Sequence, residues 1–318
     1  MGEPVSALPL RAIGPWSVAA IGLGCMPLSF SHMTGKRDQA IATIHRALDL
    51  GITLLDTANI YAPSWDTVGH NEELVADALA LYEGSTELSQ VLVTTKGGIT
   101  RSNGEVWGRD SSESALQEAC KASMSALGVT VIDLYQHHRH DPSMTYADQM
   151  RSLRKLRELG WVREVGLSNV TLTELELALD ILGGPGAGGV VSVQNEFSPR
   201  YRGDRDVLDR CTELGIAFLP WSPLGGSDHA RDLASEYSEF SLVGTEHGVS
   251  PQEIALAWLL RLSPVVIPIP GATKPTTIDS IVHAMGIELT DNQWERLNST
   301  ESLNESMYPD DMPRSPLR

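Results

Sequence analysis

The segment DLYQHHRHDP, residues 133–142, contains three histidines and an arginine in consecutive positions. Such a group could bind a metal, supply one catalytic histidine among neighbours that do not react, or form a polar loop without chemistry. No metal site is expected, because the segment lacks an HExxH spacing and an ordered set of carboxylates. Cys25, Cys120 and Cys211 also contain no CxxC pair that could bind zinc.

The alternation of side chains along a β-strand separates the first two histidines. Successive side chains point to opposite faces of a sheet, so Leu134, Gln136 and His138 would share one face. Tyr135 and His137 would share the other face. The two histidines therefore cannot both reach one metal unless the strand has already ended. His138 is the candidate for chemistry, although a lone histidine at a strand end is more often structural.

Polar and ionisable side chains also stand where other apolar runs end. Besides His138, these residues are Asp56, Lys96, Ser168, Asn169, Gln194 and Trp221. In a parallel β/α barrel, catalytic groups lie where the strands end and the βα loops begin. The sequence therefore predicts a functional site at the carboxyl ends of the strands.

Eight apolar runs must position these residues, and helical patterns separate them. The runs are residues 18–25, 52–58, 91–96, 131–138, 162–169, 190–197, 216–223 and 265–272. Gly51 and Gly160 are predicted to end helices, a capping box at Ser250 to begin one, and residues 275–284 to form another. Near-continuous apolar strands between helices are typical of a parallel sheet buried on both faces.

The fold class follows from the number of these units. Eight units without an internal linker predict an α/β fold, namely a (β/α)8 TIM barrel in one domain over residues 1–318. About residues 301–318 would form a tail. An open, doubly wound sheet remains an alternative, but no run is followed by the GxGxxG of its dinucleotide-binding version.

The composition limits the partners. The chain has 41 Asp+Glu against 24 Lys+Arg and a formal net charge of -17, whereas nucleic acids and anionic membranes attract basic surfaces. No apolar stretch approaches the length of a membrane span. The N-terminal residues lack a secretory pattern, and the separated cysteines suit a reducing compartment, which predicts a cytoplasmic location.

Seven motifs at the predicted strand ends carry a family resemblance. They are DTANIY (56–61), TTKGG (94–98), DLYQHHRHDP (133–142), VGLSN (165–169), VQNEFSPR (193–200), WSPLGG (221–226) and IPGATKP (269–275). In this order they resemble the aldo-keto reductase superfamily, and GLGCMPLS (22–29) is similar to its first strand. The resemblance covers nearly the whole chain. It implies a barrel enzyme that transfers a hydride between a nicotinamide cofactor and a carbonyl or alcohol.

The resemblance assigns four catalytic residues, which are Asp56, Tyr61, Lys96 and His138. Tyr61 would donate a proton to the carbonyl oxygen, and His138 would orient that oxygen through a hydrogen bond. Lys96, paired with Asp56, is expected to lower the pKa of the tyrosine hydroxyl. Strand alternation selects the same histidine independently.

The resemblance also implies the cofactor contacts. Ser168, Asn169 and Gln194 would bind the nicotinamide carboxamide, and Trp221 would stack on the ring. Toward the phosphates, the family pattern selects Ser222, Leu224, Gly225, Gly271, Thr273 and Lys274.

The chain departs from the family pattern at the adenosine end. Thr273 stands where many relatives have a basic residue, and Ser280 and Ile281 replace a Glu-Asn pair. Lys274 lies beside this position. NADP(H) is therefore the expected cofactor, and NAD(H) is a possible one.

Two loops and the tail are candidates for substrate binding. Residues 62–70 offer Trp65, and residues 98–112 offer Trp107. Either tryptophan could form a wall of an apolar pocket or pack only against its own loop. The tail, residues 305–318, resembles the part of the family that often covers the mouth of the pocket.

Three functions are open from the sequence. The first is a nicotinamide-dependent oxidoreductase acting on a small carbonyl or alcohol, such as an aldehyde, a ketone or a sugar. The second is a Schiff-base aldolase with Lys96 as its nucleophile, which would need a neutral lysine even though Asp56 favours the charged form. The third is a non-catalytic nicotinamide-binding regulatory subunit. The sequence does not specify the oligomeric state.

Overall fold

A parallel sheet curls into a barrel at the centre of the protein. The computed structural model describes residues 8–186, 188–309 and 314–318. Its central sheet has the strand order β11-β10-β9-β8-β5-β4-β3, and every neighbouring pair is parallel. The strands are β3 (Leu23–Gly24), β4 (Leu54–Asp56), β5 (Leu92–Gly97), β8 (Ile132–His137), β9 (Val162–Ser168), β10 (Val190–Gln194) and β11 (Ala217–Phe218).

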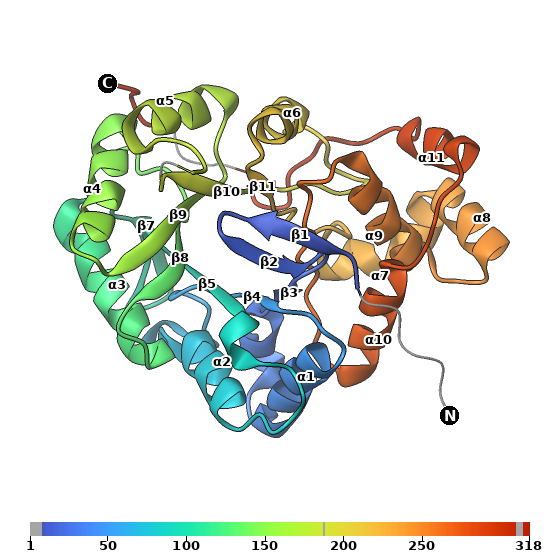
Figure 1. Cartoon of the computed structure of the whole chain (residues 1–318), viewed down its shortest axis with the longest axis horizontal. Helices are drawn as coiled ribbons and strands as arrows, with labels where there is room; N and C mark the ends of the chain where they lie inside the picture. The colour runs from blue at the N-terminus through green and yellow to red at the C-terminus, as the bar shows by residue number, and fades with distance from the viewer. Residues whose placement is uncertain (1–7, 187, 310–313) are drawn as a thin grey trace.

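The eighth predicted run closes the barrel through single bridges and does not form a regular strand. Phe218 pairs with Val266, and Gly24 pairs with Gly271, so residues 265–271 join the two edge strands. Gly22 and Gly24 also donate backbone hydrogen bonds to this segment at 2.9 and 3.0 Å. The predicted (β/α)8 barrel is confirmed, and Figure 1 shows the helices surrounding the strands.

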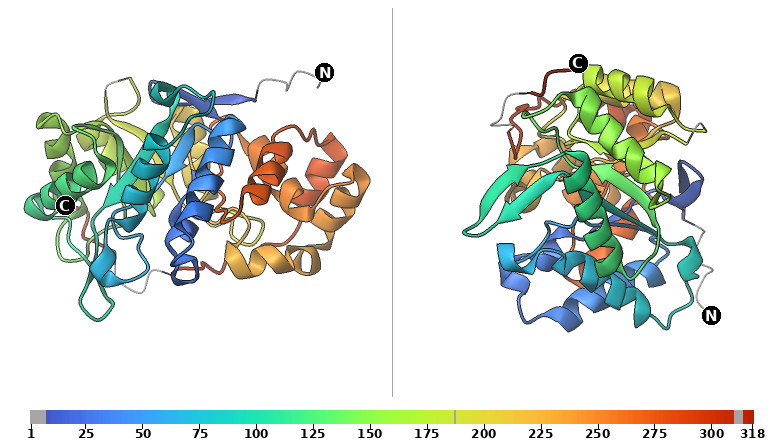
Figure 2. Two further views of the ribbon diagram at one scale, coloured as in Figure 1. Left: turned by 90° about the horizontal axis from the view of Figure 1, so that it is seen from below. Right: turned by 90° about the vertical axis from the view of Figure 1, so that its left-hand side faces the viewer.

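The predicted first strand, residues 18–25, is wrong in its extent. Its beginning belongs to β2 (Trp16–Ala19), which pairs antiparallel with β1 (Leu10–Ile13), and only β3 enters the barrel. The hairpin places Ile13 and Val18 against the apolar interior of the barrel and so closes that end. Figure 2 shows this hairpin and the β6–β7 hairpin (Ile99–Ser102 and Val106–Arg109) at opposite ends of the barrel.

Helices form the outer layer of the fold. The barrel helices are α1 (Arg37–Asp49), α2 (His70–Ala80), α3 (Glu113–Leu127), α4 (Tyr146–Glu158), α5 (Leu172–Leu182), α6 (Arg205–Leu214), α9 (Pro251–Leu262) and α10 (Pro275–Ala284). The others are α7 (Gly226–Glu236), α8 (Ser238–His247) and α11 (Asp291–Asn298), with 3-10 turns η1 (Met26–Ser29), η2 (Ser31–Met33), η3 (Trp65–Thr67) and η4 (Leu88–Gln90). Within the part of the chain that the structure describes, no helix is long and apolar enough to cross a membrane.

The predicted helix boundaries follow local chemistry. Ser250 and Glu253 form the capping box that begins α9, and the predicted helix 275–284 coincides with α10. Gly160 lies just beyond α4 with a φ of 74°, a conformation that glycine adopts without steric cost.

Strand alternation divides the buried residues into two cores. Leu54, Leu92 and Leu134 point into the barrel, whereas Tyr135 belongs to the larger core between the sheet and the helices. The interior is therefore apolar near the hairpin. It becomes polar toward the carboxyl ends of the strands, where Asp56, Lys96 and Gln136 are buried. The apolar end of the barrel interior thus lies beneath a polar site at the carboxyl ends of the strands.

Candidate active site

Lys96 is the centre of the predicted group of four. Its Nζ donates to Asp56 Oδ2 and to the carbonyl oxygen of Thr57, both at 2.8 Å. The third contact is to the Tyr61 hydroxyl at 3.4 Å, with Nζ 5.0 Å from the ring centroid. The side chain is fully buried. Since all three ammonium hydrogens have acceptors, Lys96 is fixed as a charged group.

Asp56 is held on both of its oxygens. While Oδ2 faces Lys96, Oδ1 accepts hydrogen bonds from Thr94 Oγ1 at 2.7 Å and from Gln194 Nε2 at 2.8 Å. Gln136 Nε2 adds a contact to the same oxygen at 3.3 Å. This carboxylate is buried, so the donors replace the water that it would otherwise bind.

The loop that carries Tyr61 is anchored at several backbone positions. The backbone carbonyl oxygen of Tyr61 accepts from the backbone N–H of Asn71 at 3.1 Å. The backbone N–H of Gly69 donates to the backbone carbonyl oxygen of Asn59 at 2.7 Å. Arg101 from β6 donates to the carbonyl oxygen of Ala62 at 2.7 Å. The start of α2 and the β6–β7 hairpin therefore fix the loop beside Lys96.

Tyr61 and His138 lie edge to face, with ring centroids 5.9 Å apart and an interplanar angle of 82°. Burial raises the pKa of Tyr61 and outweighs Lys96, which lowers this pKa as expected. Burial, followed by Lys96, keeps the pKa of His138 well below its usual value. Both groups are thus neutral at pH 7, a state in which a phenol and an imidazole can both donate hydrogen bonds.

The two adjacent histidines face opposite sides, as strand alternation predicts. His137 packs between the sheet and α4, with its ring centroid 6.1 Å from that of Tyr146 and its Nε2 2.9 Å from Ser111 Oγ. Burial, then His140, lowers the pKa of His137 to about 3. Among the residues that the structure describes, no group of three or more His, Cys, Asp or Glu side chains could hold a metal.

Residues predicted to contact the nicotinamide form one hydrogen-bonded chain beside the catalytic group. Asn169, with a φ of 59°, donates to Ser168 Oγ at 2.9 Å and to the carbonyl oxygen of His138 at 3.0 Å. Trp221 Nε1 donates to Asn169 Oδ1 at 3.1 Å. Gln194 joins the chain to Asp56, so its amide has a protein partner as well as the predicted cofactor role.

Among the helices that begin at this end of the barrel, two without side-chain caps follow the loops that were predicted to bind the phosphates. They are α7, preceded by Gly225 with a φ of 79°, and α10, preceded by Lys274. Uncapped backbone N–H groups at helix N-termini attract anions, so this pair fits a ligand with several phosphates. Ser222 and Leu224 lie in the loop before α7, and exposed Lys274 adds a cation at α10.

Gly271 and Thr273 have packing partners of their own. A Cβ at Gly271 would come within 2.5 Å of Pro27 Cγ, so glycine allows the barrel to close there. Thr273 O accepts from Gln39 Nε2 at 2.6 Å. The first contact explains the glycine at position 271, whereas the second uses only the backbone of Thr273, and the predicted cofactor contacts of both residues stay predictions.

The described parts of the C-terminal tail contact loops at the mouth of the barrel. Ser306 Oγ donates to Glu196 Oε2 at 2.7 Å, and the ring of Tyr308 lies 5.8 Å from that of Trp221. Farther along, Ser315 Oγ donates to Asp141 O at 2.6 Å. Residues 310–313 of the predicted tail lie outside the described residues. The described parts on both sides of them contact loops that follow β8, β10 and β11.

Trp65 lies in η3, and Trp107 lies in β7 of the β6–β7 hairpin. The backbone N–H of Trp65 donates to Glu105 Oε1 at 3.0 Å, and Arg101 lies 4.9 Å from the ring centroid of Trp107. Trp107 is 53% exposed and Trp65 is 37% exposed. Both tryptophans are therefore exposed and contact residues 99–109, and their predicted role in substrate binding stays a prediction.

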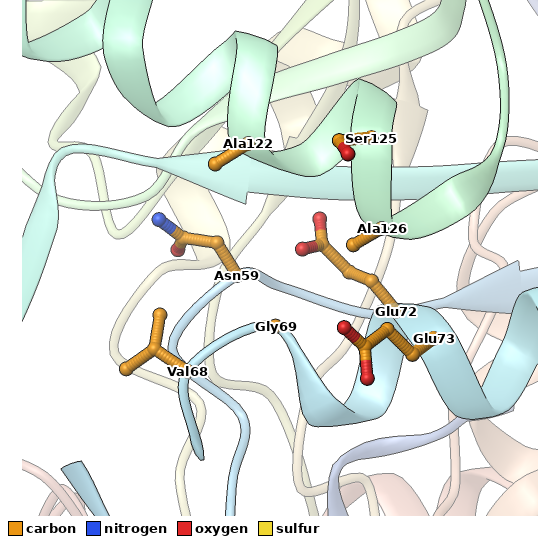
Figure 3. Close-up of a pocket in the computed structure, with 8 residues that line it drawn as sticks. All are labelled: Asn59, Val68, Gly69, Glu72, Glu73, Ala122, Ser125 and Ala126. Atoms are coloured by element: carbon orange, nitrogen blue, oxygen red, sulfur yellow. The ribbon is translucent and has the colours of Figure 1, made fainter. Parts of the chain in front are cut away.

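A cavity of about 240 Å³ lies between the Tyr61 loop, α2 and α3, lined by Asn59, Gly69 and Glu72 (Figure 3). Glu72 Oε1 accepts a hydrogen bond from Thr95 Oγ1 at 2.5 Å, and burial raises the pKa of Glu72. Thr95 points to the helix side of β5, whereas Thr94 points to Asp56. The cavity thus lies behind the catalytic group, with β5 between them.

Several residues that support the site were not predicted from the sequence. Thr94 and Gln136 contact Asp56, and Arg139 Nη2 donates to Asn169 Oδ1 at 3.3 Å. Alternation could have found the first two, because Thr94 shares a strand face with Lys96 and Gln136 shares one with His138. Glu196 and Tyr308 carry no comparable sequence signal, since their contact depends on the path of the tail.

Comparison with known proteins agrees with this arrangement. The sequence model of the aldo/keto reductase family matches residues 20–302. An uncharacterized oxidoreductase of Schizosaccharomyces pombe is 33% identical over 90% of this chain and 88% of its own length. The chain therefore belongs to the aldo/keto reductase family, a family of oxidoreductases.

Solved structures share the fold at low sequence identity. A glycerol dehydrogenase from Gluconobacter oxydans superposes with a TM-score of 0.78, at 23% identity, over 96% of this chain and 99% of that one. An aldo-keto reductase from Klebsiella pneumoniae, solved in complex with NADPH, gives a TM-score of 0.75 at 23% identity, covering 92% and 94%.

Proposed function

We propose that this protein is an NADP(H)-dependent carbonyl reductase, or the same enzyme working as an alcohol dehydrogenase, with Tyr61 as general acid and base. The observation that carries the proposal is the contact of a buried, fully hydrogen-bonded Lys96 with both Asp56 and the hydroxyl of Tyr61. The physiological substrate would be a small aldehyde, ketone, sugar or the corresponding alcohol.

Carbonyl reduction places negative charge on the carbonyl oxygen, and the proposed site meets that charge with two neutral donors. Tyr61 supplies the proton, and His138 donates a hydrogen bond that orients the oxygen. As the tyrosine loses its proton, the adjacent ammonium of Lys96 stabilises the phenolate. Asp56 keeps that ammonium charged and in place. When bound, the dihydronicotinamide supplies the hydride.

The cofactor proposal rests on the chemistry of the mouth of the barrel. Ser168, Asn169 and Gln194 would hold the carboxamide, and Trp221 would stack on the ring. The loop 222–225 and the start of α7 would bind the diphosphate, while Gly271, Thr273 and Lys274 would lie at the adenosine end. The NADPH complex of the Klebsiella pneumoniae structure supports the choice of NADP(H).

The geometry argues against the aldolase alternative. A Schiff base requires a neutral lysine with a free lone pair, whereas Lys96 is fully buried and donates to three acceptors. The pKa of Lys96 is raised, because the attraction of Asp56 and Tyr61 outweighs the opposing effect of burial. An adduct on Lys96, trapped with borohydride during incubation with a carbonyl substrate, would revive the aldolase proposal.

The direct test is an activity profile. Aldehydes, ketones and sugars are offered with NADPH or NADH while the loss of absorbance of the reduced cofactor is followed, and alcohols are offered with the oxidised cofactors. We expect turnover of at least one carbonyl with NADPH. Tight NADPH binding without turnover of any compound would favour a regulatory subunit and contradict the proposed function.

Lys274→Ala should narrow the preference for NADPH over NADH. Lys274 is the exposed cation at the start of α10, and a charge-assisted contact to the 2′-phosphate contributes about 1.5–3 kcal/mol to binding. Fluorescence titration of both cofactors measures the ratio of the two Kd values. Tighter binding of NADH than NADPH by the unchanged protein would contradict the cofactor proposal.

His138→Ala should lower kcat by about 10²-fold, since it removes a hydrogen-bond donor aimed at the developing charge. His137→Ala is the matched variant on the same strand. It removes a contact to Ser111 behind the site, so its main effect should be on stability. Equal losses of kcat in the two variants, both folded by circular dichroism, would contradict the role of His138.

A further inference from the structure

Asp56 Oδ1 is surrounded by neutral donors from three different strands. Thr94 comes from β5, Gln136 from β8 and Gln194 from β10, and all three side chains are buried in the barrel interior. Gln136 Nε2 also lies 3.5 Å from Thr94 Oγ1. Among the described residues, the partners of this carboxylate are these three neutral donors and the charged Lys96.

We infer that Thr94 and Gln136 are positioning residues for the proposed reaction, which hold Asp56 Oδ1 so that Oδ2 faces Lys96. Neither residue contacts Lys96 or Tyr61 through a hydrogen bond of its own, so both act through the carboxylate. The inference rests on the proposed function, and it extends the working site one step into the barrel. Thr94 has the larger role, because its hydroxyl makes the shorter contact.

The physical effect of these donors is to reduce the negative charge that Asp56 presents to its surroundings. A hydrogen bond to a buried carboxylate offsets part of its charge, and its loss increases the negative potential at neighbouring groups. Tyr61 would then hold its proton more tightly and become a weaker acid. The charged and titratable groups that act on Tyr61 are Lys96, Asp56 and Tyr308, whereas His138, Cys25 and Glu72 interact with Lys96.

The chain offers a matched pair of variants to test this. Thr94→Val removes the hydroxyl aimed at Asp56, while Thr95→Val removes an adjacent, equally buried hydroxyl aimed at Glu72. For Thr94→Val we expect kcat to fall about tenfold, with the KM values for NADPH and the carbonyl changed less than twofold.

The pH profile gives a readout that a purely structural role would not change. In alcohol oxidation Tyr61 must first lose its proton, so Thr94→Val should shift the rise of activity upward by about half a pH unit. Thr95→Val should leave the profile and kcat close to those of the unchanged protein. Thr94→Ser, which retains a hydroxyl, should recover most of the lost activity. Thermal unfolding of all three variants separates loss of fold from loss of positioning.

The outcomes distinguish the inference from the proposed function. If the unchanged protein turns over a carbonyl but Thr94→Val matches Thr95→Val in kcat and pH profile, the positioning role is wrong and the proposed function stands. If the unchanged protein turns over no carbonyl or alcohol with either cofactor, both are wrong. A fall in kcat without any shift of the pH profile would also overturn the inference, because the charge of Asp56 would then be unaffected.

Discussion

Tyr61→Phe should lower carbonyl reduction by about 10²–10⁴-fold, the contribution of a positioned general acid, while cofactor affinity stays nearly unchanged. Phenylalanine preserves the ring that packs edge to face against His138 and removes only the hydroxyl beside Lys96. The predicted nicotinamide contacts come from other loops. The loss should therefore appear in kcat and not in the Kd for NADPH.

A second tyrosine at the mouth of the barrel provides the control. Tyr308, a residue of the C-terminal tail, packs against Trp221 and is 53% exposed. Tyr308→Phe therefore removes a hydroxyl at the mouth of the barrel and leaves the contacts of Lys96 unchanged. Single-turnover reduction of the best carbonyl substrate should be close to normal in this variant. The Tyr61→Phe variant could instead reduce this substrate at the normal rate, with hydride transfer shown to be rate-limiting. Another group would then supply the proton.

The protonation state of Tyr61 also determines how the rates of reduction and oxidation depend on pH. Burial raises its pKa above the usual value near 10, so the acid form required for reduction persists through neutral pH. It is lost only as the pH rises through the raised value. Oxidation needs the phenolate and should become faster as the pH increases. The two directions of the reaction should therefore have opposite pH dependence on the alkaline side.

The sequence predicted the parts of this site that depend on strand order and strand alternation. A polar residue that follows an apolar run can be recognised from the sequence alone. Asp56, Lys96 and His138 were predicted in this way. Alternation also separated His137 from its neighbour, and the structure places the two rings on opposite faces. These features depend on local periodicity along the chain, so a single sequence is enough to predict them.

Other features depend on contacts between distant segments and were not predictable in this way. The net effect on the pKa of Tyr61 requires the degree of burial as well as the distance to Lys96, and burial proved the larger influence. Residues 18–25 are divided between a hairpin and the barrel because β1 pairs with β2. This pairing forms the hairpin that covers one end of the barrel. The contact of Glu196 with the tail joins residues 110 positions apart.

Lys96→Met should abolish measurable reduction and also destabilise the protein. The ammonium is the only charged partner of Asp56 within hydrogen-bond distance in the described residues, and both side chains are almost completely buried. Removing one member of such a pair leaves an uncompensated charge, which costs about 3–5 kcal/mol of unfolding free energy. Methionine fills a similar volume, so the loss reflects charge more than packing.

The double variant Asp56→Asn, Lys96→Met separates the two effects. Asparagine removes the unpaired charge while its side-chain oxygen can still accept from Thr94 and Gln194, so much of the lost stability should return. Carbonyl reduction should not return, because Tyr61 still lacks the ammonium that stabilises its phenolate. Urea unfolding and NADPH turnover of the two variants measure both quantities. If turnover recovers together with stability, Lys96 serves only to hold the fold, and its proposed action on Tyr61 is wrong.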